Sequence, residues 1–322
     1  FRLFKHFEMD GIKRINLIAG NNNVGKSTLL EAIYIYGNRV TNDYFNNIRI
    51  FRSMDSNVLK LIQSFFHMYN IENSVTFKID DKDTFKICKS EESNSSFNIS
   101  YDKFTLSLVI KQLENGKEIF EIDGSAFKNL INYTYTRYLG RDFYSTDYIC
   151  ELLSVSVANG NVARDKIIEL LKLLDPRVRD FNINQDNDGL GKDLNIKLDK
   201  DIFFPIRTLG DGINKLIQII LSLYSEPNSI LLIDEIENGF YYKFYPKLWE
   251  MLGKVAKETN CQIFATTHSY ECTKGAKVLN DSDEPDLFGF IRLDRDKNDN
   301  IIPKMYSGET FQYAMDYGWE VR

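Results

Sequence analysis

One short segment, Gly20–Ser27, constrains what this chain can fold into more than any other part of it. Its sequence, GNNNVGKS, fits the G-x-x-x-x-G-K-[ST] template of a phosphate-binding loop. An apolar run at Ile15–Ala19 precedes it and favours a buried strand, and a helical pattern follows at Thr28–Tyr36. In such a strand–loop–helix unit, backbone N–H groups at the positive end of the helix bind phosphate. The sequence therefore predicts a site for a nucleoside triphosphate.

Two side chains of the loop have distinct expected roles. Lys26 reaches the β and γ phosphates, and the hydroxyl of Ser27 is a ligand of a bound Mg²⁺. The expected nucleotide-binding residues of this segment are Gly20, Asn21, Asn22, Asn23, Val24, Gly25, Lys26, Ser27 and Thr28. The alternative is a chance match in a loop, and the flanking strand and helix argue against it.

Composition narrows the class of protein. The chain has 322 residues, enough for one large domain or two smaller ones with a substantial core. No apolar run approaches the roughly 18 residues of a membrane span, and the first residues do not resemble a signal peptide. The four cysteines lie far apart without metal-ligand spacing, which indicates reduced thiols in a cytoplasmic protein. The net charge of −6 disfavours a surface that coats nucleic acid, although it leaves room for a local basic groove and for DNA binding there.

The hydrophobic pattern predicts secondary structure for the other segments of the first half of the chain. Phe1–Phe7 alternates apolar and polar residues and favours a strand, and Val58–Met68 has helical spacing. Short alternating stretches separated by polar turns extend over Val75–Ile122 and predict an antiparallel meander. Gly124–Asp180 is rich in tyrosine and then helical, which indicates a variable insertion that contacts a partner. The tyrosines either pack within the fold or form a stacking platform or a protein interface.

In the second half, polar residues come directly after two predicted strands. Ile230–Ile233 is followed by Asp234 and Glu235, and Cys261–Thr266 is followed closely by His268. In open α/β sheets, ligands bind beyond the carboxyl ends of the strands. We therefore expect these three side chains in one crevice with the phosphate loop.

These residue types suit the hydrolysis of a bound triphosphate. Asp234 fits the carboxylate that holds Mg²⁺, directly or through water, and Glu235 fits the base that orients and deprotonates the attacking water. His268 can donate a hydrogen bond to a γ-phosphate oxygen or sense its loss. Each also has a plainer interpretation, with Glu235 as a solvated residue at a strand end and His268 as a structural histidine.

A glycine-rich segment, Gly210-Asp211-Gly212, begins a long apolar helix. Its backbone N–H groups can bind an anion, and that anion could belong to a nucleotide held by a second subunit. The plainer interpretation is a tight turn before a helix.

Four segments occur along the chain in this order: GNNNVGKST, TLGDGINKL, ILLIDEIENGF and FATTHS. Together they resemble the ATPase head of the ABC superfamily, in its SMC, RecF and OLD branch. The chain looks most like stand-alone OLD-like ATPases of bacterial anti-phage defence, such as the ATPase of PARIS systems, whose ends also resemble MDYGWEVR. The resemblance covers about Phe1–Tyr36 and Ile206–Arg322. It implies an α/β fold of the ABC-type P-loop ATPase head, with two lobes, a mostly parallel core sheet, an antiparallel β-meander and a helical insertion.

The resemblance implies a role for each candidate residue. The implied Walker A loop, Walker B metal ligand, catalytic base and switch histidine are Gly20–Thr28, Asp234, Glu235 and His268. The implied signature, Gly210–Gly212, caps ATP across a head-to-head dimer. ATP and Mg²⁺ are the implied cofactors.

The sequence departs from the family's pattern at two places, and one residue of the pattern is not located. Gly210 replaces the signature serine, so the γ phosphate loses one hydroxyl contact and slow hydrolysis is expected. Phe240-Tyr241-Tyr242 replaces the usual Leu-His in the loop that contacts the other head. The glutamine that usually follows the first lobe is not assigned, and Gln112 is not offered for it.

The implied organisation is an N-terminal ATPase lobe at 1–123, a helical, tyrosine-rich insertion at 124–180 and a C-terminal ATPase lobe at 181–322. The implied partner is a second copy, in a homodimer or higher homo-oligomer with ATP sandwiched between heads. OLD-type proteins often carry a TOPRIM nuclease domain, for which the stretch after His268 is too short. A nuclease or toxin effector is therefore expected as a separately encoded polypeptide.

Three functions stay open at this point. The first is a dimerising ATPase that acts as a switch and controls an effector in anti-phage defence. The second is a RecF-like repair ATPase that clamps DNA, for which salt-sensitive DNA affinity is the discriminating property. The third is a module that binds the nucleotide without hydrolysing it, so that the nucleotide only rigidifies an assembly. The signature disfavours a transporter subunit.

Overall fold

The chain divides into two compact units in the computed structural model. The first unit comprises Phe1–Glu8, Asn23–Thr134 and Arg295–Ile302, and the second comprises Met9–Asn22, Tyr135–Asp294 and Pro303–Arg322. The structure describes residues 2–38, 65, 74–79, 83–89, 96–101, 104–112, 118–122, 135–140, 144–185, 191–199, 202–280 and 284–318. Apart from Phe65, the helix predicted at Val58–Met68 lies outside these described residues.

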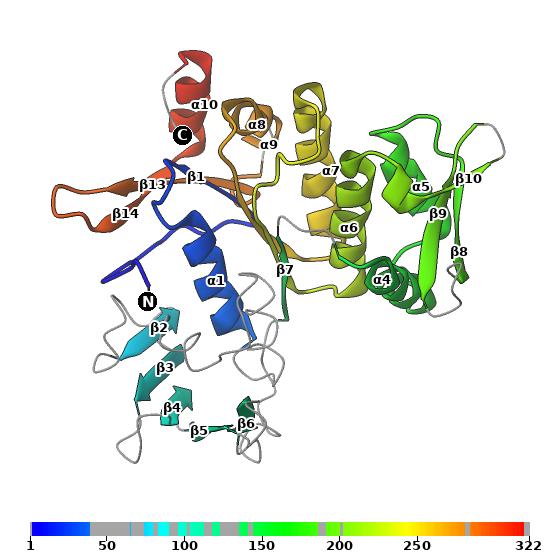
Figure 1. Cartoon of the computed structure of the whole chain (residues 1–322). Helices are drawn as coiled ribbons and strands as arrows, with labels where there is room; N and C mark the ends of the chain where they lie inside the picture. The colour runs from blue at the N-terminus through cyan, green and yellow to red at the C-terminus, as the bar shows by residue number, and fades with distance from the viewer. Residues whose placement is uncertain are drawn as a thin grey trace. The chain divides into compact units, whose positions relative to one another are not determined.

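The second unit is organised around a six-stranded sheet (Figure 1). In spatial order its strands are β14 (Ile301–Tyr306), β13 (Phe288–Arg295), β1 (Ile15–Gly20), β12 (Gln262–Thr266), β11 (Ile230–Ile233) and β7 (Thr136–Leu139). The pairs β13–β1, β1–β12, β12–β11 and β11–β7 are all parallel. Strand β1 is buried along its whole length, as expected for a central strand of a covered parallel sheet. The strands predicted from the buried apolar runs in both halves of the chain are confirmed.

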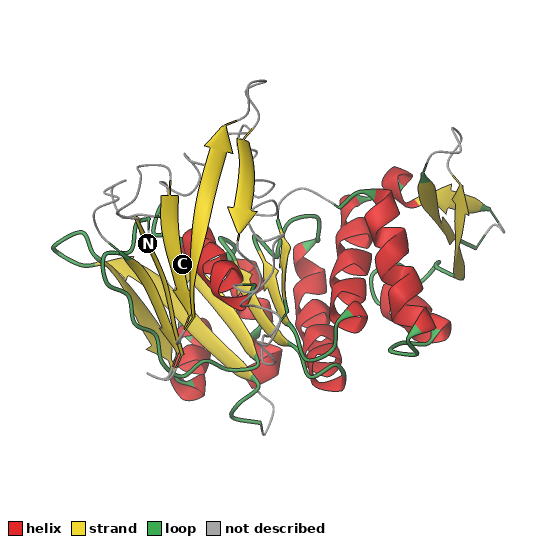
Figure 2. Ribbon diagram, turned by 90° about the horizontal axis from the view of Figure 1, so that it is seen from below, coloured by secondary structure: helices red, strands yellow, loops and turns green. Residues whose placement is uncertain are grey.

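Helix α6 (Asp211–Ser225) lies at the centre of the helices that cover this sheet. Every residue from Lys215 to Ser225 is buried, in keeping with a sequence that is apolar on all sides. Its neighbours are α4 (Thr146–Ala158), α5 (Arg164–Lys172) and α7 (Tyr245–Glu258), and Figure 2 shows these helices side by side. The long apolar helix predicted after Gly212 is therefore confirmed, and it is buried in the core of the second unit.

A second, smaller sheet contacts the helices rather than the main sheet. Its strands are β8 (Asp180–Gln185), β9 (Lys192–Lys197) and β10 (Phe203–Pro205), and their order is β10-β9-β8 with antiparallel pairing. Helix α4 packs against β9. Residues 186–190, between β8 and β9, lie outside the described residues.

Strand β7 comes from the segment that the sequence assigned to an insertion. Its four residues, TRYL, pair with β11 in the main sheet and are all buried. The pattern missed it because a strand of four residues shows neither a clear alternation nor a long apolar run. Helices α4 and α5 follow it and supply the helical part of this segment. The division of the chain at 123/124 and 180/181 stays a prediction.

The first unit contains α1 (Lys26–Gly37) and an antiparallel five-stranded sheet. The strands are β2 (Val75–Ile79), β3 (Asp83–Lys89), β4 (Ser96–Tyr101), β5 (Phe104–Gln112) and β6 (Glu118–Ile122), each paired with the next. The predicted meander is confirmed.

The strand predicted at Phe1–Phe7 is wrong. Residues 2–7 form turns and bends, and none of them is in a strand. Phe4 is buried, with its ring centroid 4.6 Å from that of Phe7. The alternation therefore reflects the packing of aromatic side chains rather than a pleated strand.

Short helices complete the described chain. They are η3 (Ile206–Thr208), η4 (Tyr242–Phe244), α8 (Tyr270–Gly275), α9 (Lys277–Asn280) and α10 (Gly308–Asp316). All four cysteines fall within the described residues and none forms a disulfide. Within the described part of the chain, no helix has both the length and the apolar character that a bilayer crossing requires.

Candidate active site

The carboxyl ends of β1, β12 and β11 lie at one edge of the sheet because the three strands are adjacent and parallel. Gly20 ends β1, Asp234 follows β11, and Thr267 follows β12. The backbone N–H of Thr267 donates to the carbonyl oxygen of Ile18 at 3.0 Å, which joins two of these strand ends directly. The structure thus brings the start of the phosphate loop, the Asp-Glu pair and the histidine segment to the same edge.

The remainder of the phosphate loop belongs to the first unit and leads into α1 at Lys26. Asn23 and Gly25 have left-handed backbone conformations, with φ of 63° and 88°. A Cβ atom at Gly25 would lie 3.1 Å from the ring of Phe4, so both the conformation and the available space require glycine there. The guanidinium of Arg295 donates to the carbonyl oxygen of Asn23 at 2.7 Å. A loop of this backbone type, at the N-terminus of a helix, suits an anion.

Asp234 is buried and held by two hydroxyl groups. The Oγ1–H of Thr266 donates to one carboxylate oxygen at 2.5 Å, and the hydroxyl of Tyr138 donates to the other at 3.2 Å. These bonds fix the orientation of the carboxylate at the end of β11. Mg²⁺ in nucleotide sites is usually held by one or two carboxylates together with phosphates and water. The chemistry of the Asp234 carboxylate fits such an ion.

Glu235 has an unusual backbone conformation, with φ of 48°. For a residue other than glycine such a conformation costs about 1–3 kcal/mol, and it often marks a functional position. Its backbone N–H donates to Oγ1 of Thr266 at 2.9 Å, and Nδ2 of Asn238 donates to its Oε2 at 2.8 Å. Its other carboxylate oxygen lies 4.0 Å from Nε2 of His268. The conformation therefore directs the carboxylate toward His268 at the sheet edge.

His268 is positioned through its backbone rather than its ring. Its N–H donates to Oε1 of Glu237 at 2.7 Å, so the chain segment that carries Glu235 also carries the residue that holds the histidine. The next residue, Ser269, caps α8 by accepting from the backbone N–H of Cys272. The imidazole is partly exposed, with 38% of the side chain accessible, so it can approach a bound phosphate.

The glycine-rich segment lies at the N-terminus of α6 and has two different environments. Apart from its chain neighbours, no described residue has an atom within 4 Å of the position of a Cβ added at Gly210. At Gly212 an added Cβ would lie 2.7 Å from the carbonyl oxygen of Gly239, so here the backbone of the helix touches the backbone of the segment after Glu235. Gly239 itself has a left-handed φ of 85°.

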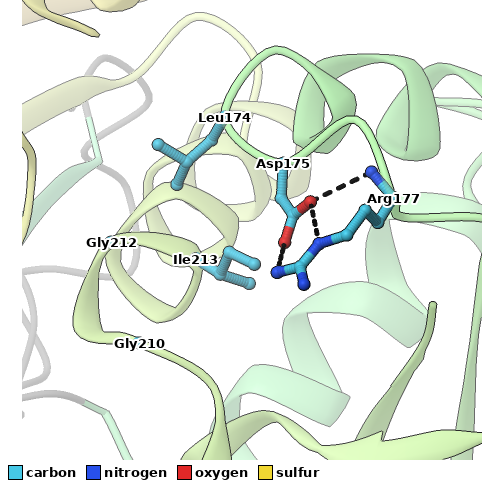
Figure 3. A pocket seen from close by; sticks show the side chains of 6 residues that line it. All are labelled: Leu174, Asp175, Arg177, Gly210, Gly212 and Ile213. Atoms are coloured by element: carbon cyan, nitrogen blue, oxygen red, sulfur yellow. Dashed lines mark hydrogen bonds and ion pairs between the residues drawn. The ribbon is translucent and has the colours of Figure 1, made fainter. Parts of the chain in front are cut away.

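Beside this segment is an open hollow of about 390 Å³ (Figure 3). It is lined by Leu174, Asp175, Arg177, Gly210, Gly212 and Ile213. The guanidinium of Arg177 donates to both carboxylate oxygens of Asp175, at 3.0 and 2.8 Å. These hydrogen bonds lower the pKa of Asp175. The hollow thus combines helix N–H groups with a partly neutralised guanidinium.

Replacing Gly212 by alanine is expected to lower the free energy of unfolding by about 1–3 kcal/mol, because the added methyl must displace the carbonyl of Gly239. The matched control is Gly210→Ala, for which open space predicts a change within about 0.5 kcal/mol. Denaturant unfolding of both variants measures this difference. Equal stabilities of the two variants would contradict the backbone contact.

Several residues that build the site were not identified from the sequence. Thr266 and Tyr138 hold Asp234, Asn238 holds Glu235, and Glu237 holds His268. Tyr138 belonged to the predicted tyrosine cluster, for which packing in the fold was one of the two interpretations. The local signals for the others were weak, since each is a polar residue next to a motif and only the fold reveals its partner.

A mostly parallel sheet with a phosphate loop after one strand, an Asp-Glu pair after another and a histidine after a third defines an ABC-type P-loop ATPase. The chain belongs to the family of AAA domains described as "putative AbiEii toxin, Type IV TA system", which matches residues 15–272.

The chain is also similar to curated proteins. The chain is similar to an "ATP/GTP phosphatase" of Helicobacter pylori (strain ATCC 700392 / 26695), with 23% identity over 362 residues, 98% of this chain and 96% of the relative. It also shares 30% identity over 73 residues with the "ABC-type organic anion transporter ABCA8B" of Mus musculus, which covers 23% of this chain and 4% of the transporter.

Solved structures resemble the fold. An SMC head bound to the C-winged helix domain of ScpA has a TM-score of 0.54 at 14% identity, with 95% of each chain covered. A Pyrococcus furiosus Smc head with an extended coiled coil, bound to the C-terminal domain of ScpA, has a TM-score of 0.53 at 11% identity. That match covers 98% of this chain and 96% of the head. The predicted α/β fold of an ABC-type P-loop ATPase head is confirmed. Together with the family match and the relative named as an ATP/GTP phosphatase, it identifies the chain as an ATPase.

Proposed function

We propose that this protein is a Mg²⁺-dependent cytoplasmic ATPase switch, in which two copies sandwich ATP and control a separately encoded effector. The observation that carries the proposal is the arrangement of side chains at the carboxyl ends of β11 and β12. There the carboxylate of Glu235 lies 4.0 Å from the imidazole of His268, beside the buried carboxylate of Asp234. A base, a phosphate-sensing group and a metal ligand are the three groups that hydrolysis of a terminal phosphate needs next to a phosphate loop.

In the proposed reaction, Lys26 neutralises the β and γ phosphates and Ser27 with Asp234 holds Mg²⁺. The metal ion supplies charge stabilisation and orients the triphosphate. Glu235 accepts a proton from the attacking water, and His268 donates a hydrogen bond to a γ-phosphate oxygen. The loop from Gly20 to Thr28 binds the phosphates through its backbone N–H groups.

The segment Gly210–Gly212 is proposed to complete the site of a second copy. The open hollow beside it leaves the helix N-terminus accessible, and Arg177 is 65% exposed at its rim. The absence of a hydroxyl at Gly210 removes one donor to the γ phosphate, and loss of such a donor can cost about 3 kcal/mol of transition-state stabilisation. Slow turnover is therefore part of the proposal, and it suits a switch better than a pump.

The effector and the setting rest on two lines of support. The family's description refers to a putative toxin of a type IV TA system. The four ordered motifs resemble those of OLD-like ATPases of anti-phage defence, such as the PARIS ATPase. We therefore propose that nucleotide-dependent dimerisation holds or releases a nuclease or toxin encoded beside this chain.

Native mass measurement of the protein purified from its own operon tests this proposal. With Mg²⁺ and a non-hydrolysable ATP analogue, the mass is expected to rise to two or more copies together with a bound second protein. A Gly210→Trp variant is the control. No described atom beyond the chain neighbours lies within 4 Å of an added Cβ at Gly210, so the side chain can leave the backbone there, and its ring is expected to block the partner's nucleotide. A single-copy mass at every nucleotide concentration would contradict the switch.

The same samples separate two alternatives. A GTP analogue in place of the ATP analogue reports base preference, which matters because the Helicobacter pylori relative is named for both nucleotides. Duplex DNA added with nucleotide tests the RecF-like alternative. A DNA affinity that rises with ATP and falls steeply with salt would favour that alternative.

A further inference from the structure

Lys215 is a buried cation with no role in the site described above. Only 5% of it is exposed, and it is the one charged residue in the buried stretch from Lys215 to Ser225 of α6. Lysine is rarely buried without a partner, because the ammonium group loses its hydration. A specific interaction must therefore offset that loss.

The partner of Lys215 is the backbone of Glu235. Nζ of Lys215 donates to the carbonyl oxygen of Glu235 at 2.7 Å, a short, charge-assisted hydrogen bond. The N–H on the other side of the same residue donates to Oγ1 of Thr266 at 2.9 Å. The backbone N–H and carbonyl groups of Glu235 are thus both hydrogen-bonded to side chains, one from α6 and one from β12.

These two hydrogen bonds are made by a residue in a left-handed conformation, since the φ of Glu235 is 48°. An L-residue leaves that conformation unless the surroundings hold it. Because the conformation of the backbone sets the direction of the side chain, the bond from Lys215 helps to direct the carboxylate of Glu235. Asn238, which donates to that carboxylate at 2.8 Å, restrains the other end of the side chain.

Carboxylates near Lys215 favour the protonated, positively charged form of its ammonium group. Burial lowers the pKa of Lys215 to about 8, and the carboxylates of Glu237, Asp234 and Glu235 oppose this shift. The ammonium group is therefore still largely protonated at pH 7. It also contributes positive charge to a region with three carboxylates.

We propose that Lys215 is a positioning residue for hydrolysis, which holds Glu235 in its strained backbone conformation and joins the signature helix α6 to the end of β11. The inference rests on the proposed role of Glu235 as the base. A second contact connects α6 to the same segment, since Gly212 on α6 touches the carbonyl of Gly239, four residues after Glu235. A shift of α6 would therefore act on the base directly.

The first test is Lys215→Met, which keeps a long apolar stem and removes the donor. The turnover number is expected to fall about tenfold or more, while the Kd for ATP changes less than about twofold. The control is Ser222→Ala on the same helix, a buried position whose hydroxyl makes no hydrogen bond within the described part of the chain. Its turnover number and Kd are expected to match the parent.

The second test is a double-mutant cycle with Glu235→Gln. If Lys215 acts through Glu235, Lys215→Met slows the parent but leaves the residual rate of Glu235→Gln unchanged. An unchanged turnover number for Lys215→Met, or the same fold-loss in both backgrounds, would overturn the inference. Where Lys215→Met shows no cooperative melting transition, Lys215→Gln replaces it in the same cycle.

The cycle also separates this inference from the proposed function. If Glu235→Gln hydrolyses ATP at the parent rate, the proposed base is wrong whatever Lys215→Met does. If Glu235→Gln is inactive and Lys215→Met is fully active, the base stands and only the positioning role fails.

Discussion

Replacement of Glu235 by Gln is expected to lower the turnover number for ATP by roughly a hundredfold to ten-thousandfold, the usual contribution of a general base. The amide cannot accept the proton of the attacking water, yet it retains the size of the side chain and can still accept a hydrogen bond from Asn238. Binding of ATP should therefore persist, and the ATP-bound dimer should accumulate because hydrolysis no longer ends it. Phosphate release and native mass, measured on the same sample, report the two effects.

The matched control for that change is Glu250→Gln, an exposed carboxylate on α7. Its turnover number should equal that of the parent. Parent-like hydrolysis by Glu235→Gln would exclude Glu235 as the base. A parent that releases no phosphate at all would instead support a module that only binds the nucleotide.

Mixing two inactive variants is expected to restore activity if each site is built from two copies. Lys26→Ala removes the cation that contacts the β and γ phosphates, so its own loop fails. Gly210→Trp keeps its own phosphate loop and is expected to obstruct the nucleotide of its partner. An added Cβ at Gly210 meets no described atom within 4 Å beyond the chain neighbours, so the variant is expected to fold. In a mixed dimer, the intact loop of one variant meets the intact signature segment of the other.

Half of the dimers in an equal mixture are mixed, and each holds one intact site, so activity should recover to about a quarter of the parent value. Each variant alone should be nearly inactive. Hydrolysis measured across a series of mixing ratios should peak at equal amounts. A mixture no more active than its components would show that each chain supplies a complete site by itself.

The strongest sequence predictions concerned segments whose function depends on adjacent residues. The GNNNVGKS loop needs left-handed positions next to a helix N-terminus, and the structure has them at Asn23 and Gly25. The apolar run before Asp234 and the apolar helix after Gly212 are visible in the order of residue types alone. The prediction failed at Phe1–Phe7, where residues 2–7 form turns and bends despite the alternation.

The sequence by itself determined the chemical groups of this protein: a phosphate loop, an Asp-Glu pair after a buried strand, a histidine after another and a glycine-rich helix start. These features depend on local residue type and period, which any reader of the chain can see. Only the tertiary structure decided what holds them. Tyr138 reaches Asp234 because β7 pairs with β11, and Lys215 reaches the carbonyl of Glu235 because α6 packs under that strand end. Such contacts depend on which distant segments become neighbours, and long-range pairing leaves no local pattern in the sequence.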